Sequence, residues 1–146
     1  MFVRIIILFA VLFLSPAVFA DDDKLSRGEK RLADIMAKYE KTGEIKQCVN
    51  LRRLRESRVI DEHTIFFRGI GKTGYLNRFN GKCAGLVREE RFSYSTTINQ
   101  LCRGEILTVL DSFGRSWGSC AIGEFEELTK KPTSNSAIDN LESKTQ

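Results

Sequence analysis

The run Asp61-Glu62-His63 is the densest group of side chains in this sequence that could carry acid–base chemistry or bind a metal ion. Consecutive residues on a turn point in different directions, so the three side chains are not expected to converge on one ion. His63 is the only histidine in the chain, which leaves it no obvious partner for nucleophilic catalysis. The pattern favours a polar turn between two strands. An enzyme that uses Asp61, Glu62 or Asp111 with His63 is an alternative.

A second candidate, Gly71-Lys72-Thr73, resembles the end of a phosphate-binding loop. The full motif needs a glycine five positions earlier, where this chain has Phe66, and a helix afterwards. The residues that follow alternate like a strand, which predicts a glycine-rich hairpin turn. The sequence therefore predicts no catalytic residue, no cofactor and no metal site, and it gives no positive evidence of an enzyme.

Four cysteines, Cys48, Cys83, Cys102 and Cys120, are the other residues with reactive chemistry. No two of them have the C-x-x-C spacing of a redox centre, and a single histidine argues against a zinc site or haem attachment. An even number of cysteines in an exported chain predicts two disulfides, each contributing about 2–4 kcal/mol. Spacing alone leaves all three pairings open.

The densest basic stretch contains Arg52, Arg53, Arg55 and Arg58. A strand over residues 48–54 would send Arg52 and Arg53 to opposite faces, so the arginines would form no clean stripe. Neither exposed aromatic residues nor a recognised fold accompanies them, so nucleic-acid binding is not indicated. The net charge of +4 is mild. We expect a solvated surface, with contact to anionic envelope polymers or lipid headgroups as the alternative.

Residues 1–20 predict the compartment of the protein. Arg4, an apolar run from Ile5 to Leu14 and the site Val18-Phe19-Ala20 form the pattern of a cleaved secretory signal peptide. The apolar run is far shorter than the ~20 residues that span a bilayer. We therefore expect a mature chain that begins at Asp21, has no transmembrane segment, and is periplasmic or secreted.

A helix over about residues 26–42 is expected to open the mature domain. Ser26 and Glu29 have the spacing of a capping box. Leu32, Ile35, Met36 and Tyr39 follow at helical intervals, and Gly43 is placed to end the helix.

From about residue 47 to 127, short β-branched and aromatic runs alternate with turn-forming groups. This pattern predicts a mainly β (α+β) fold, in which the helix packs on a small antiparallel barrel or sandwich of about six strands. The hydrophobic content of 42% includes the leader, so the remaining core is thin and benefits from two disulfides. Trp117 is expected in this core, residues 21–128 in one domain, and residues 129–146 in a disordered tail.

A series of short motifs along the chain follows the same order as in a known family. These motifs are Tyr39, Gly43-Glu44-Ile45, the strand from Cys48, the turn Asp61–Ile65, Tyr75-Leu76-Asn77, Cys83-Ala84-Gly85-Leu86, Cys102 and Cys120-Ala121-Ile122-Gly123. The chain is similar here to small exported bacterial proteins of the uncharacterised domain-of-unknown-function family 6491. The resemblance implies export and a compact β domain, and it implies no activity. Some members keep only the cysteines resembling Cys83 and Cys120, so the resemblance implies the pairs Cys83–Cys120 and Cys48–Cys102.

These observations together favour an exported, non-catalytic binding or interaction module stabilised by disulfides. The loops 69–74 and 112–118 could present its contacts, and an inhibitor of an extracellular hydrolase is one concrete form. The sequence does not identify the partner, and an envelope or extracellular protein is one candidate.

Overall fold

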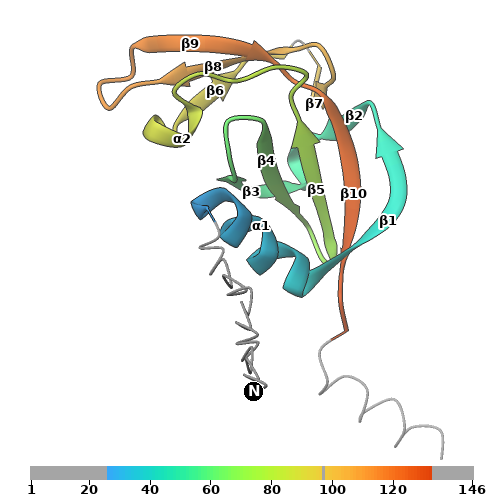
Figure 1. Ribbon diagram of the computed structural model, residues 1–146. Helices are drawn as coiled ribbons and strands as arrows, with labels where there is room; N and C mark the ends of the chain where they lie inside the picture. Colours follow the sequence, from blue (N-terminus) through green and yellow to red (C-terminus); the bar gives the residue numbers. More distant parts are fainter. Residues whose placement is uncertain (1–25, 97, 133–146) are drawn as a thin grey trace, which may run out of the picture.

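The computed structural model describes residues 26–96 and 98–132, which are the coloured part of Figure 1. The predicted signal peptide lies outside the described residues, as does most of the predicted tail. The elements in chain order are α1 (Arg27–Lys38), β1 (Tyr39–Lys46), β2 (Cys48–Asn50), the 3-10 turn η1 (Leu51–Arg53), β3 (Leu54–Val59), β4 (Thr64–Gly69), β5 (Thr73–Arg78), α2 (Leu86–Glu89), β6 (Phe92–Tyr94), β7 (Gln100–Cys102), β8 (Ile106–Leu110), β9 (Ser116–Ala121) and β10 (Glu124–Lys130).

The strands of this part of the chain form three antiparallel sheets. The largest has five strands in the order β1-β10-β5-β4-β3, and it is open at β1 and β3. A second sheet has the order β6-β8-β9, and a third pairs β2 with β7. Figure 1 shows the β6-β8-β9 sheet and α2 projecting from one end of the molecule. Of the two predicted architectures, the structure has the sandwich and not the closed barrel.

The five-stranded sheet is buried on both faces. On one face α1 packs through Ile35 against Phe66, Leu76 and Leu128, and Tyr39 stacks edge-to-face on Phe66. On the other face the main core contains side chains from the central sheet, both small sheets and α2; they include Val49, Phe67, Leu86, Leu101, Leu107, Val109 and Phe125. The mainly β fold with one packed helix is therefore confirmed.

The predicted end of the helix near residue 42 is wrong. The capping box is present, because the backbone N–H of Ser26 donates to Glu29 and that of Glu29 donates to the Ser26 hydroxyl. The helix ends at Lys38, because Tyr39 is already extended and opposes Lys130 in the sheet. Gly43 has the left-handed conformation expected of it, with φ +84°, but uses it where the β1–β10 register is irregular.

The described residues contain ten strands and not about six. Edge strands β1 and β3 carry mostly charged, exposed side chains, so a search for apolar runs misses them. The predicted tail boundary is also wrong, because Thr129 pairs with Thr73 and Glu40, inside β10. The strand predicted over residues 48–54 ends at Asn50, whose side chain accepts from Arg52 N at 3.0 Å and starts η1.

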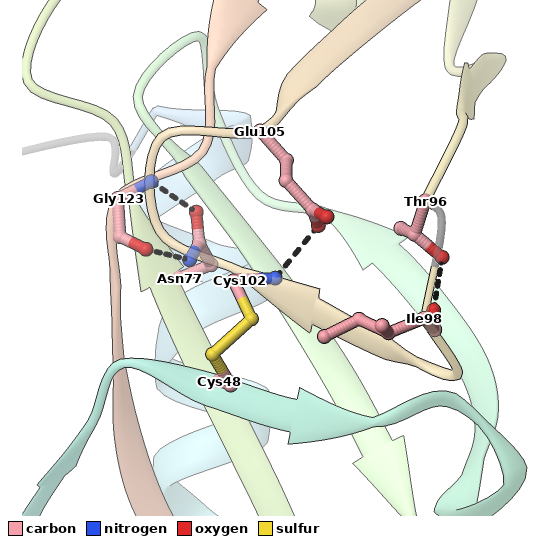
Figure 2. Close-up of a disulfide and its surroundings, with 7 residues drawn as sticks. All are labelled: Cys48, Asn77, Thr96, Ile98, Cys102, Glu105 and Gly123. Atoms are coloured by element: carbon pink, nitrogen blue, oxygen red, sulfur yellow. Dashed lines mark hydrogen bonds between the residues drawn. A yellow bond between two sulfur atoms is a disulfide. The ribbon is translucent and has the colours of Figure 1, made fainter.

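Both disulfides form, in the pairs that the family resemblance implies, and the described residues contain no free cysteine. Cys48 and Cys102 face each other directly across β2 and β7 (Figure 2). Cys83 is buried just before α2, and its bond to Cys120 ties β9 to the body of the domain. Disulfides of this kind are typical of oxidising compartments outside the cytoplasm.

Asn77 is a buried polar residue that holds the start of β10 against β5 (Figure 2). Its Nδ2 donates to the carbonyl oxygen of Gly123 at 2.8 Å, and its Oδ1 accepts from Gly123 N at 3.2 Å. The side chain thus replaces a pair of main-chain bonds where the chain passes from the β8-β9 sheet into the central sheet.

Across residues 26–96 and 98–132, no helix combines the length and apolar character needed to cross a bilayer.

Candidate functional site

Residues 61–63, the alternative acid–base candidates, lie in the turn between β3 and β4, as the favoured interpretation expects. Asp61 Oδ1 accepts from His63 N at 2.6 Å, and Glu62 pairs with Lys82 at 2.7 Å. The His63 side chain is exposed and contributes to no cluster. In the part of the chain that the structure describes, no three His, Cys, Asp or Glu side chains come close enough to hold a metal ion.

Gly71 and Lys72 of the second candidate lie in the hairpin turn between β4 and β5, as the sequence predicts, and Thr73 begins β5. Gly71 has φ +72°, the left-handed conformation that such a turn requires. No helix follows it, so the segment has no phosphate-binding geometry.

The four clustered arginines lie on two different elements, with Arg52 and Arg53 on η1 and Arg55 and Arg58 on β3. All four are exposed, and none forms an ion pair with another residue of the described chain. The turn at η1 separates the pairs, so they form no continuous stripe along one strand. Contact of this cluster with an anionic surface remains a prediction.

Replacing Arg52, Arg53 and Arg55 with glutamine is expected to change the free energy of unfolding by less than about 1 kcal/mol for each residue, since exposed charges contribute little. We expect weak retention of the parent on a polyanion resin at ~0.15 M salt, where exposed charges beyond about 8 Å are screened. Elution of the parent and the triple variant from the resin with a salt gradient measures this retention. Tight, salt-sensitive retention lost in the triple variant would identify the cluster as an anion-binding surface.

The β8–β9 hairpin carries two large exposed aromatic side chains, Phe113 and Trp117. Asp111 stabilises its turn, because Oδ1 accepts hydrogen bonds from the backbone N–H groups of Phe113 and Arg115, both at 2.9 Å. Asp111 Oδ2 also pairs with Arg115 Nε at 2.8 Å, and Gly114 provides φ +78°. The result is a fixed turn that presents Phe113 with 83% of its surface exposed.

Acid is expected to loosen this turn. The backbone N–H of Arg115, followed by the Arg115 side chain and the backbone N–H of Phe113, holds the pKa of Asp111 below its ordinary value. Because the pKa of Asp111 is lower in the folded protein than its ordinary value, the ionised carboxylate stabilises the fold at pH values above that ordinary pKa. This stabilisation is lost as the pH falls through the lowered pKa. We expect faster amide hydrogen exchange at Arg115 over that range, measured by NMR.

The Asp111→Asn variant is the matched control for this titration. It retains an oxygen acceptor but has no titratable carboxyl group. Exchange at Arg115 that still accelerates with acid in this variant, after correction for intrinsic exchange, would contradict the assignment to Asp111.

Trp117 was expected in the core, and this prediction is wrong, because 53% of its surface is exposed. Between Val109 and Leu110 the register with β9 shifts by one residue, which leaves Trp117 as a bulge. Its ring packs over Gly85, where an added Cβ would lie 2.3 Å from the indole. The Arg88 guanidinium stacks 3.9 Å from the ring centroid.

Two arginine–aromatic stacks therefore lie on one hairpin and the neighbouring α2: Arg88 on Trp117, and Arg115 at 5.3 Å from the Phe113 ring centroid. We call Arg88, Phe113, Arg115 and Trp117 the hairpin surface. Each arginine pairs with a carboxylate that is largely covered. The side chains of Arg88 and Arg115 are 58% and 76% exposed, whereas those of Glu89 and Asp111 are 16% and 14% exposed. The surface consequently presents aromatic rings and guanidinium groups to solvent.

A separate open hollow of about 400 Å³ lies on the helix-bearing face of the central sheet, lined by residues that include Arg78, Arg103 and Glu124. Three of its four charged lining residues are paired, since Arg103 pairs with Glu124 at 2.7 Å and Glu126 pairs with Lys41 at 2.8 Å. This pairing makes the hollow a weaker candidate than the hairpin surface.

No protein-family model, curated protein or solved structure matches this chain. The resemblance to family 6491 therefore stays a prediction.

Proposed function

We propose that the protein is an exported, non-catalytic interaction module that engages its partner through the hairpin surface. The observation that carries this proposal is the exposure of Phe113 and Trp117, at 83% and 53%, on a hairpin whose turn is held by the hydrogen bonds of Asp111. Large exposed aromatic residues beside arginines have the composition of interface hot spots.

Pre-organisation of the hairpin supports the same proposal. Asp111 fixes the turn, and the Cys83–Cys120 disulfide fixes β9 to the segment before α2. A rigid contact surface loses little conformational entropy on binding, which favours affinity. An isolated Phe on a mobile loop would lack this advantage.

The photo-crosslinking amino acid benzoylphenylalanine at position 113 tests the proposal in the native envelope. We expect a discrete protein adduct, identified by mass spectrometry. The matched control places the same group at Ala33, an exposed position on α1. Equal labelling from both positions, or glycan and lipid products alone, would contradict an interaction module that uses the hairpin surface.

Export supports the choice of partner, because it delivers the four cysteines to an oxidising compartment and the module to envelope or extracellular proteins. We expect the mature protein to begin at Asp21 and to contain no free thiol. Intact mass before and after treatment with a thiol reagent measures both. Uptake of the reagent without prior reduction, or a retained leader, would contradict this prediction.

A further inference from the structure

The outer edge of β9 is a row of main-chain groups that the described chain leaves without main-chain partners. β9 is the last strand of the β6-β8-β9 sheet. Ile122, which follows β9, donates its N–H to the carbonyl oxygen of Glu105, which precedes β8. Successive residues of an antiparallel strand bond to alternate sides, so Cys120 and Gly118, two and four residues before Ile122, also bond toward β8. The bond from Leu110 N to Arg91 O, toward β6, agrees with the same alternation along β8. The N–H and C=O groups of Ser119 and Ala121 therefore face outward from the sheet.

The long edge strands of the central sheet are protected, and β9 is not. β3 carries Arg55, Glu56 and Arg58, and β1 carries alternating charges and an irregular register. Charges and bulges are the usual means by which proteins prevent strand addition. β9, Ser116–Ala121, contains no charged residue and no proline, and four of its residues beyond the Trp117 bulge pair regularly with β8.

We propose that β9 accepts an extended acidic segment of a partner protein as an added antiparallel strand, with its carboxylates bound by Arg88 and Arg115. This proposal rests on the proposed interaction function and names the partner chemistry. Strand addition supplies affinity through main-chain hydrogen bonds, and flanking side chains supply specificity. Ser119 and Ala121 would provide the bonds, and Trp117 would pack against an apolar residue of the segment.

Charge complementarity favours an acidic partner. Glu89 and Asp111 are mostly covered whereas Arg88 and Arg115 are mostly exposed, so a bound molecule can contact the guanidinium groups more readily than the carboxylates. Arg115 uses Nε for Asp111. Its terminal N–H groups form no hydrogen bond within the described chain. A guanidinium with free N–H groups matches a carboxylate in a two-pronged contact.

Other occupants fit less well. A second copy of β9 would bring no carboxylate to the two arginines, because Ser116–Ala121 is uncharged. A lipid surface would offer anionic headgroups to the two arginines, but it has no row of main-chain groups that could pair with the edge N–H and C=O groups of Ser119 and Ala121.

The test uses the mature protein and a short capped peptide in which glutamate and valine alternate, with a lysine–valine peptide as the charge control. We expect the acidic peptide alone to bind. Binding is expected to slow amide exchange at Ser119 and Ala121, whereas Gly118 and Cys120 are already bonded to β8. NMR titration with hydrogen exchange reports both effects.

Two kinds of variant separate the backbone and charge contributions. Ser119→Pro removes an outward N–H; proline is tolerated at such an edge, and the preceding Gly118 reduces steric conflict. Its matched control, Ser119→Val, retains the N–H. We expect a loss of affinity of about tenfold for Ser119→Pro, and likewise for Arg115→Gln, with little change for Ser119→Val. The thermal unfolding midpoint checks that each variant is folded.

Several results would overturn strand addition: equal binding of both peptides, unchanged affinity of a folded Ser119→Pro variant, or slowed exchange elsewhere than at the edge. A dimer that Ser119→Pro dissociates would assign the edge to a second copy. Binding to phosphatidylglycerol vesicles that depends on Arg115 but not on Ser119→Pro would assign the surface to lipid. A persisting protein adduct at position 113 would show that only strand addition, and not the interaction function, has failed.

Discussion

Replacing Cys83 and Cys120 together with alanine is expected to lower the free energy of unfolding by about 4 kcal/mol. The two cysteines are 37 residues apart, and the entropy of closing a loop of that length in the unfolded chain corresponds to about 4 kcal/mol at 25 °C. The domain has little reserve with which to absorb this loss, because small domains are only marginally stable. Urea denaturation of the oxidised parent and the double variant measures the difference.

The Cys48–Cys102 pair provides the comparison. It closes a separation of 54 residues, for which the same relation also gives about 4 kcal/mol. We expect similar losses of stability from the two double variants but different local effects, since only Cys120 lies on β9. Loss of the hairpin crosslink at position 113 should follow removal of the Cys83–Cys120 pair alone. A loss of less than about 1 kcal/mol would show that the unfolded chain is already compact.

Replacing Gly123 with alanine is expected to cost about 3 kcal/mol or more. An added Cβ would lie 1.7 Å from the carbonyl oxygen of Arg78, a main-chain atom that cannot turn aside as a side chain can. Relief of this contact must move β10 away from β5 and disturb the bonds between Gly123 and the buried side chain of Asn77. Overpacking and buried unsatisfied groups are among the few single changes with effects this large.

Gly81→Ala is the matched control for this substitution. An added Cβ at Gly81 meets no atom within 4 Å, and Gly81 lacks the left-handed φ that makes other glycines of this chain sensitive. We expect its free energy of unfolding to stay within about 0.5 kcal/mol of the parent. Denaturation of both variants under the same conditions is the measurement. Equal stability of the two variants would contradict the close approach of Gly123 to Arg78.

The sequence predicted those features that arise from neighbouring residues. The spacing of Ser26 and Glu29 predicted the start of α1, and glycine-containing turns predicted the β4–β5 and β8–β9 hairpins. The end of α1 was mispredicted because Tyr39 satisfies both the helical spacing and a strand, and the pairing with Lys130 decides between them. Contacts across most of the chain cannot be inferred from local periodicity.

The candidate site was harder to predict, for a comparable reason. Trp117 has a neighbour in Gly85 and a stacking partner in Arg88, and both lie about thirty residues away in the sequence. A lone tryptophan in a small disulfide-bonded domain favours the core, and the bulge that exposes it has no sequence signature. A local signal did exist for the turn, since aspartate two residues before Phe113 is a typical side-chain cap of a turn.

The position of β10 has a consequence for folding kinetics. β10 is the last described strand, yet it lies between β1 and β5 and bonds to both. Tyr39 cannot pair with Lys130 until the chain has been synthesised beyond residue 130. Pairings this distant in sequence make folding slow. The five-stranded sheet therefore cannot be completed until β10 has been synthesised, because β10 joins β1 to β5.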